Sequence, residues 1–266
     1  MKYILIFILT LNFSSLHADI VMGIVPQQSP LKLFKSWSPI AQYLSKVTGE
    51  KIIFKTEKSI TEFEKVLYSG GYDFAYMNPY HLIVAYKTQA YHAELRAKKN
   101  IQGILVMKKG DTIEKIKNKN ISYLFPAPNA FAATLLTKYD LLQKHGVNIE
   151  ILNKAKYVNS HDSVYKGVSR GLGDIGGGIQ RTFNALDDEK TKSSLHIVHT
   201  TKQYPSHPFA FKPSMKDEMK TKIINALLNM PSSYLNKLKI KELRKTNNDE
   251  YAPIKELATK LKVREY

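Results

Sequence analysis

Short apolar runs alternate with amphipathic helical patterns along most of the chain, and this alternation restricts the possible folds more than any other feature. Residues 19–25 form an apolar run typical of a buried strand, and over 31–48 apolar residues recur at every third or fourth position, as on the buried face of a helix. Strands are also predicted at 51–56, 72–76, 103–108, 121–125 and 174–178, and helices at 59–68, 80–87, 130–144, 162–170, from 180, at 215–228 and at 254–261. Strands and helices in turn are typical of an α/β fold with mainly parallel sheets.

Length and composition narrow the class further. With 266 residues, of which 43% are hydrophobic, the chain can form one large globular domain or two lobes of roughly 100 to 150 residues. It contains no cysteine, which excludes disulfide scaffolds, thiolate nucleophiles, thiolate zinc sites and iron–sulfur clusters. Any chemistry must therefore use oxygen and nitrogen groups.

The first eighteen residues have the layout of a secretory signal peptide. Lys2 precedes an apolar run over 3–11, and the small residue Ala18 stands just before Asp19. The run is much shorter than the ~20 apolar residues that a membrane-spanning helix needs. We therefore expect residues 1–18 to be removed, and the mature chain, which has no cysteine for a lipid anchor, to be soluble in the periplasm.

The chain is strongly basic, with 40 Lys and Arg against 23 Asp and Glu and a formal net charge of +17. Such an excess of positive charge can indicate binding to nucleic acid, to anionic lipid or to an anionic ligand. Only five of the basic residues are arginines, whose bidentate fork is favoured for base recognition, and the lysines are spread along the chain. We expect no nucleic-acid binding and interpret the lysines, including the lysine-rich stretch 237–245, as a solvated surface.

Four junctions between a strand and the next helix share one design. They lie at 76–81, 126–131, 159–163 and 176–182. Each presents unpaired backbone N–H groups and the positive end of a helix dipole, which together favour bound anions. Ligands of open α/β sheets bind beyond the carboxyl ends of the strands, where these junctions lie.

Each junction also has a purely structural interpretation. Asn78 can simply cap a helix, His161 can bond a backbone carbonyl, and the glycines at 176–178 can let a helix pack closely on the sheet. The residues alone leave both interpretations open.

Catalytic and metal-binding patterns are nearly absent. Ser160, His161 and Asp162 carry the letters of a hydrolase triad, but neighbours in sequence point in different directions and cannot relay a proton. His196 and His199 lie on a predicted strand, where a spacing of three sends the rings to opposite faces. We expect no catalytic residue, no metal site and no cofactor.

The residues at these junctions resemble a known family. The segments GIVPQQSPLKLFKSWSPIAQYLSKVTGEKIIFKT, GGYDFAYMNPYH, LFPAPNAFAATLL and SHDSVYKGVSRGLGDIGGGIQRTFNAL look like the phosphate/phosphite/phosphonate-binding proteins of ABC transporters. The resemblance implies a type II periplasmic binding protein fold, with two α/β lobes joined by two crossing strands and closing over an anion. It places lobe 1 at 19–106 and 207–266 and lobe 2 at 107–206.

The resemblance also implies a binding site, carried over by position. Its residues come from the tyrosine-rich junction, two helix starts of the second lobe and the return segment: Tyr76, Asn78, Tyr80, Asn129, Ala130, Phe131, His161, Ser163, Tyr204 and His207.

Two positions depart from the family pattern. Asn129, Ala130 and Phe131 stand where the family commonly has Ser-Thr-Ser, which removes hydroxyl donors and narrows the pocket, and His207 stands where it commonly has an aspartate. A buried carboxylate accepts the proton of a monohydrogen oxyanion, whereas an imidazole can donate. The departures favour a fully ionised oxyanion, or a small polar ligand that is not a phosphonate, over phosphate or an aminophosphonate.

We therefore expect a periplasmic solute-binding protein, active as a monomer, that captures a small phosphate-, phosphite- or phosphonate-like oxyanion between its lobes. Its partner is an ABC permease or the sensor domain of a histidine kinase, and the sequence leaves both open. The alternative from another class is a periplasmic enzyme acting on a small anionic substrate. The absence of a nucleophile with a separate base argues against that alternative.

Overall fold

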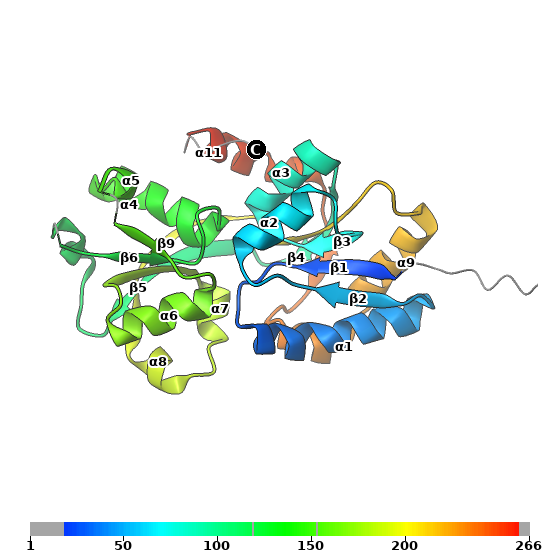
Figure 1. The fold of residues 1–266 in the computed structure, drawn as a ribbon, viewed down its shortest axis with the longest axis horizontal. Coiled ribbons are helices and arrows are strands. Elements are labelled where there is room, and N and C mark those ends of the chain that lie inside the picture. The colour runs from blue at the N-terminus through cyan, green and yellow to red at the C-terminus, as the bar shows by residue number, and fades with distance from the viewer. Residues whose placement is uncertain (1–18, 119, 153, 261–266) are drawn as a thin grey trace, which may run out of the picture.

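The structure is a computed structural model that describes residues 19–118, 120–152 and 154–260. The predicted signal peptide, residues 1–18, lies outside the described residues. Among the described residues, no helix is both long and apolar enough to cross a lipid bilayer. Two lobes lie side by side, each built on its own sheet (Figure 1).

Lobe 1 contains a six-stranded sheet in the order β11-β4-β10-β3-β1-β2. Its strands are β1 (Ile20–Ile24), β2 (Ile52–Lys55), β3 (Phe74–Tyr76), β4 (His92–Ala97), β10 (Pro208–Phe211) and β11 (Leu243–Lys245). Its helices are α1 (Pro30–Thr48), α2 (Ile60–Tyr68), α3 (Pro79–Gln89), α9 (Asp217–Leu228), α10 (Ser232–Lys237), the 3-10 helix η3 (Asn248–Tyr251) and α11 (Ala252–Lys260). In Figure 1 the sheet lies between α1 below it and α2 and α3 above it.

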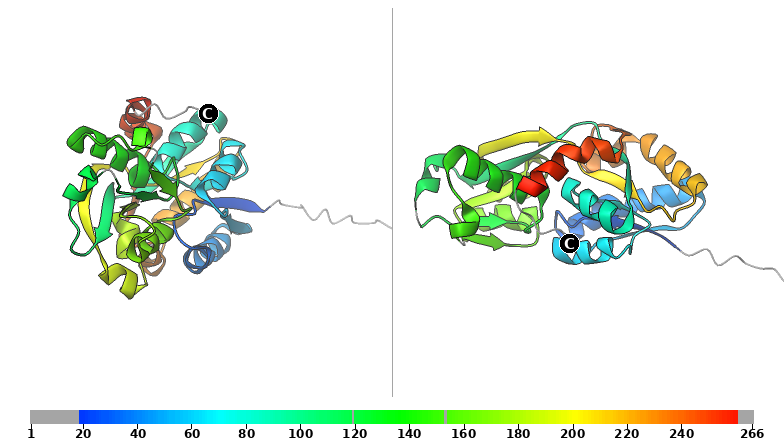
Figure 2. Two further views of the ribbon diagram at one scale, coloured as in Figure 1. Left: turned by 60° about the vertical axis from the view of Figure 1, so that its left-hand side comes forward. Right: turned by 90° about the horizontal axis from the view of Figure 1, so that it is seen from above.

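Lobe 2 contains a five-stranded sheet in the order β7-β6-β8-β5-β9. Its strands are β5 (Ile101–Lys108), β6 (Tyr123–Phe125), β7 (Ala155–Tyr157), β8 (Ile175–Ile179) and β9 (Leu195–Tyr204). Its helices are the 3-10 helix η1 (Ile113–Lys117), the π-helix η2 (Phe131–Leu136), α4 (Thr137–His145), α5 (Ile149–Leu152), α6 (His161–Arg170), α7 (Gln180–Asn184) and α8 (Glu189–Ser193). The two views of Figure 2 show the same pair of lobes from the side and from above.

The helix boundaries follow from local sequence signals. Helix α1 has Pro30 at its start and ends at Gly49, whose φ of 77° is the left-handed conformation that glycine adopts without strain. Helix α2 begins after Ser59, whose hydroxyl accepts a hydrogen bond from the backbone N–H of Glu62, as the sequence pattern predicts.

The two-lobed α/β architecture is confirmed, but the sheets are mixed rather than mainly parallel. β1 is parallel to β2 and β3, whereas β10 is antiparallel to both β3 and β4. In lobe 2, β5 is likewise antiparallel to β8 and β9. The physical reason is that β4 and β5 carry the chain from lobe 1 into lobe 2, whereas β9 and β10 carry it back. The outgoing and returning strands of each sheet, β4 with β10 and β5 with β9, therefore run in opposite directions.

The chain passes between the lobes at 98–100 and again at 205–207. The first crossing differs from the boundary expected near Met107, because β5 pairs with β9 of the second sheet from its first residue, Ile101 opposite Tyr204. Residues 101–106 therefore belong to the second sheet and not to lobe 1.

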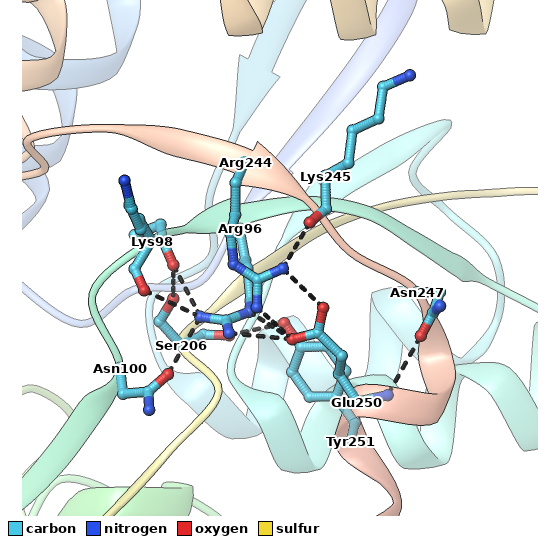
Figure 3. Close-up of polar contacts among 10 residues, drawn as sticks. Arg96, Lys98, Asn100, Ser206, Arg244, Lys245, Asn247, Glu250 and Tyr251 are labelled. Atoms are coloured by element: carbon cyan, nitrogen blue, oxygen red, sulfur yellow. Dashed lines mark hydrogen bonds and ion pairs between the residues drawn. The ribbon is translucent and has the colours of Figure 1, made fainter.

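A buried polar network fastens both crossings to the C-terminal part of lobe 1 (Figure 3). The guanidinium of Arg96, on β4, donates to the backbone oxygens of Ala97 and Lys98 and to the side chain of Asn100. On the second crossing, the hydroxyl of Ser206 donates to the backbone oxygen of Ala97 over 2.9 Å. Tyr251 donates to the backbone oxygen of Ser206 over 2.8 Å, so η3 holds both crossings in one place.

Glu250 neutralises this network. Its carboxylate accepts hydrogen bonds from Arg96 over 3.0 Å and from Arg244 over 2.7 and 2.6 Å. Mainly because of the hydrogen bond from Arg244, the pKa of Glu250 falls to about 2. Since Arg96 is buried, this carboxylate supplies the counter-charge that its guanidinium needs.

We expect Glu250→Gln to lower the free energy of unfolding by about 2 kcal/mol at pH 7, because it leaves the Arg96 cation without its counter-charge. Glu242→Gln is the matched control, since Glu242 pairs with Lys98 on the exposed surface and such pairs contribute little. Urea unfolding of the three proteins measures the difference.

The wild-type protein should also lose this contribution as the pH falls from about 4.5 to about 2, because the carboxyl binds protons more readily in the unfolded chain. Equal free energies of unfolding for the two variants would show that the charge of Glu250 does not stabilise the network at the two crossings.

Candidate functional site

A pocket of about 660 Å³ lies between the lobes, against both crossings. Lobe 1 contributes Tyr76 and His207, and lobe 2 contributes Arg181. Its other lining residues are Ala97, Lys98, Lys99, Asn100, Ile101, Gln102, Ile179, Gln180, Asn184, Gln203, Ser206, Asn236, Lys239, Ile240, Lys241 and Glu242. The volume falls within the roughly 300 to 1,000 Å³ typical of small-molecule sites.

Arg181 bridges the two lobes at this pocket. It lies at the start of α7, directly after the glycine-rich strand β8, and its guanidinium donates to Gln27 Oε1 over 3.0 Å and to the backbone oxygen of Leu238 over 3.2 Å. Both acceptors belong to lobe 1. Arg181 forms no ion pair with a carboxylate of the described residues.

These contacts determine the protonation of His207. Because Arg181 donates to Oε1 of Gln27, the other end of that amide is the NH₂ group, and it contacts Nε2 of His207. Nε2 must then be the acceptor, so the proton of the neutral ring sits on Nδ1. Burial, and next the Arg181 charge, hold the pKa of His207 well below its usual value.

Tyr76 ends β3 and forms an aromatic wall of the pocket. Its ring stacks on His207 with centroids 5.4 Å apart, and the Arg181 guanidinium lies 5.8 Å from its centroid. Burial raises the pKa of Tyr76, although Arg181 acts in the opposite direction. The phenol is therefore neutral and can donate a hydrogen bond.

His161 begins α6 and is buried beside the same loop of lobe 1. Its backbone N–H donates to the backbone oxygen of Gln27 over 3.0 Å, and its Nδ1 lies 2.9 Å from Thr182 Oγ1. Burial, helped by Arg181, lowers the pKa of His161 to about 3. The ring is neutral at physiological pH, and the structure gives its Nε2 no hydrogen-bond partner among the described residues.

A second polar cluster connects the lobes at the start of α3. Asn78 caps this helix by accepting from the backbone N–H of His81 over 2.9 Å, and its amide donates to the backbone oxygen of Asn129 over 3.3 Å. The buried carboxylate of Glu64 accepts from Asn129 Nδ2 over 3.4 Å and lies 3.0 Å from His81 Nε2. Asn78 therefore both caps helix α3 and contacts lobe 2.

A comparison with protein families matches residues 22–251 to the family described as the periplasmic substrate-binding protein of phosphonate ABC transporters. The match covers most of the chain, including both lobes and both crossings. The chain belongs to this family. The members are substrate-binding components of transport systems, and this finding does not favour a kinase-sensing partner or an enzyme.

Solved structures of low sequence identity share the fold. A binding protein component of a phosphonate ABC transporter from Pseudomonas aeruginosa is 16% identical, with a TM-score of 0.84, and the match covers 92% of this chain and 86% of that one. PhnD1 from Prochlorococcus marinus, solved with methylphosphonate, is 19% identical, with a TM-score of 0.83 and coverage of 92% and 98%. A Xanthomonas citri protein bound to ATP is 13% identical, with a TM-score of 0.67 and coverage of 92% and 98%.

The structure gathers some of the residues predicted from the family resemblance and separates others. Tyr76 and His207 line the pocket, while His161, Asn78 and Asn129 lie at the lobe interface close to it. As ligand contacts, these remain predictions.

The other predicted residues lie elsewhere. Tyr80 lines a different groove, between α3 and α11, and Ser163 is an exposed residue whose backbone N–H donates to the Ser160 cap. Phe131 packs edge-on against Tyr204 with centroids 5.5 Å apart. Phe131 and Ala130 belong to an apolar cluster that continues into the core of lobe 1, so this junction supplies packing between the lobes.

The glycines of β8 serve close packing. A Cβ on Gly177 would overlap the backbone oxygen of Ala133, and one on Gly103, in the neighbouring strand β5, would overlap that of Ala132. Both oxygens belong to η2, which therefore lies directly on the sheet. This supports the structural interpretation of the glycine run.

Sequence reasoning missed Gln27, Arg181 and Glu64. Arg181 stands in the fourth junction and is one of five arginines, which is a signal that could have drawn attention to it. Gln27 lies in a loop and Glu64 on a helix, and neither carries a local signal of its own.

Proposed function

We propose that this chain is a periplasmic receptor that binds an oxyanion of the phosphonate type at Arg181 between its lobes and delivers it to an ABC permease. The family assignment supports the transport role. We infer the class of ligand from the Arg181 guanidinium, a permanent cation at the lobe interface that pairs with no carboxylate of the described residues. An anionic ligand would supply the missing counter-charge.

The groups around Arg181 are donors. His207 carries its proton on Nδ1, and Tyr76 is a neutral phenol. Donors without an opposing carboxylate suit an oxyanion that has lost its protons, as the His207 substitution suggests from the sequence.

Closure of the lobes would couple to binding through contacts that join them. Asp162, on α6, accepts from the backbone N–H of Ser29 at the start of α1, over 3.1 Å. Lys32 forms an ion pair of 3.1 Å with Asp187 of lobe 2. Arg181 itself contacts Gln27 and Leu238, so a ligand on Arg181 would favour the arrangement in which these contacts form.

The test is isothermal titration calorimetry of the mature protein with methylphosphonate, phosphite, phosphate and sulfate, together with thermal unfolding. We expect at least methylphosphonate or phosphite to bind, and to stabilise the fold by about 2.7 kcal/mol at a concentration one hundred times Kd. Small-angle scattering should show compaction on binding. If none of the four anions binds, the proposed function is wrong.

A further inference from the structure

The turn after α10 places Lys239 and Lys241 in the lining of the same pocket as Arg181. We infer that this protein takes phosphonates bearing a second anionic group, such as a carboxylate, which Lys239 and Lys241 bind while Arg181 binds the phosphonate. The inference rests on the proposed function and specifies its substrate class. It assigns a role to a stretch whose composition predicts only a solvated surface.

The first observation is the charge of the pocket lining. Five basic side chains line the pocket, from Lys98, Lys99, Arg181, Lys239 and Lys241, against the single carboxylate of Glu242. Glu242 pairs with Lys98 over 3.0 Å. Lys99, Lys239 and Lys241 have no ion-pair partner among the described residues, so the free charge of this wall is entirely positive.

The second observation is the connection between the lysines and Arg181. The backbone oxygen of Leu238 accepts a hydrogen bond from Arg181 over 3.2 Å, and Lys239 is the next residue. The turn is closed by the backbone N–H of Lys239 donating to Asn236 and that of Ile240 donating to Leu235, each over 3.1 Å. Arg181 and the two lysines are therefore parts of one wall of the pocket.

The third observation is the size of the pocket, together with the backbone conformation of Lys239. A pocket of about 660 Å³ accommodates more than a tetrahedral oxyanion with one methyl group. Lys239 has a φ of 54°, a left-handed conformation that glycine adopts without the steric cost that a lysine incurs. A lysine at this position gives the pocket a cation that glycine would not.

The positive charge of the pocket lining also disfavours one class of substituent. An ammonium group would meet unpaired lysines and one carboxylate that Lys98 already neutralises. A carboxylate or a second phosphonate would meet complementary charge. Aminoalkylphosphonates should thus bind less tightly than carboxyalkylphosphonates of the same length.

The experiment is calorimetry at low ionic strength with 3-phosphonopropionate, propylphosphonate, 2-aminoethylphosphonate and methylphosphonate. Propylphosphonate matches the length of 3-phosphonopropionate without its second charge. We expect the wild-type protein to bind 3-phosphonopropionate about five- to tenfold more tightly than propylphosphonate, the effect of two partly exposed charge contacts. The aminophosphonate should bind more weakly than either.

The double variant Lys239→Gln/Lys241→Gln should lose this five- to tenfold preference and keep its affinity for methylphosphonate within about threefold. The matched control is Lys237→Gln/Lys245→Gln, which removes two charges from the same lysine-rich stretch without touching the pocket lining. The control should retain the preference.

Three outcomes would overturn the inference. Methylphosphonate binding without a preference for the second charge contradicts the inference alone and leaves the proposed function standing. An equal loss in the control variant would assign the preference to general surface charge. Failure of the wild-type protein to bind any of the four phosphonates would contradict the inference, and failure to bind phosphite, phosphate and sulfate as well would contradict the proposed function.

Discussion

Arg181→Gln is expected to reduce the affinity for the anion by about 100- to 1,000-fold, the largest effect that any single side chain of the pocket should have. The substitution removes charge-assisted hydrogen bonds, each of which contributes about 1.5 to 3 kcal/mol, and it removes the only arginine that lines the pocket among the described residues. It also removes the contacts of Arg181 with Gln27 and Leu238 that connect the lobes. The fold should remain intact, because the side chain is only half-buried.

Calorimetry with the best ligand measures the loss, and Arg170→Gln is the matched control. Arg170 ends α6 in the same lobe, is exposed and does not line the pocket. Arg181→Lys should recover part of the affinity, because it restores the charge without the fork of donors. An affinity of Arg181→Gln within threefold of the wild type would show that the anion binds elsewhere.

The same variant provides a second readout. The charge of Arg181 lowers the pKa of both His161 and His207. Both pKa values should rise in Arg181→Gln, and neither should change in Arg170→Gln. NMR titration of the histidine rings distinguishes a direct electrostatic role of Arg181 from a loss of structure.

Gly177→Ala is expected to cost about 3 kcal/mol of the free energy of unfolding. The added Cβ would overlap the backbone oxygen of Ala133 and the ring of Phe125. The oxygen belongs to η2 and cannot move without displacing that helix from β5 and β8, so the strain cannot relax locally. Ligand affinity should fall as well, because Arg181 lies two residues after the end of β8.

Gly167→Ala is the control for this prediction. Gly167 lies inside α6, and a Cβ there would come closest to the end of the flexible Leu124 side chain rather than to a backbone atom. Alanine is also favoured over glycine inside a helix by about 1 kcal/mol, so the net change should remain below about 1 kcal/mol. Urea unfolding followed by circular dichroism measures both variants, and similar values would refute the packing role of Gly177.

The sequence predicts much of the secondary structure because its signals are local. Periodicity and cap residues act within a few positions, so helices α1, α2 and α6 begin and end close to where the sequence places them. Strands β4 and β10 were not predicted, since β4 carries the charged Arg96 and β10 has only four residues. Both are strands because they pair with each other, and β10 pairs also with β3.

The sequence alone determines a strand–helix alternation, junctions suited to anions and, by resemblance, the family. Only the tertiary structure decides which of these residues meet. Gln27 lies 154 residues from Arg181 and 180 residues from His207, yet all three are in contact. The packing of the two lobes against each other brings them together, and with them the Lys239 turn. Contacts of such separation depend on the path of the whole chain and leave no periodic trace in the sequence.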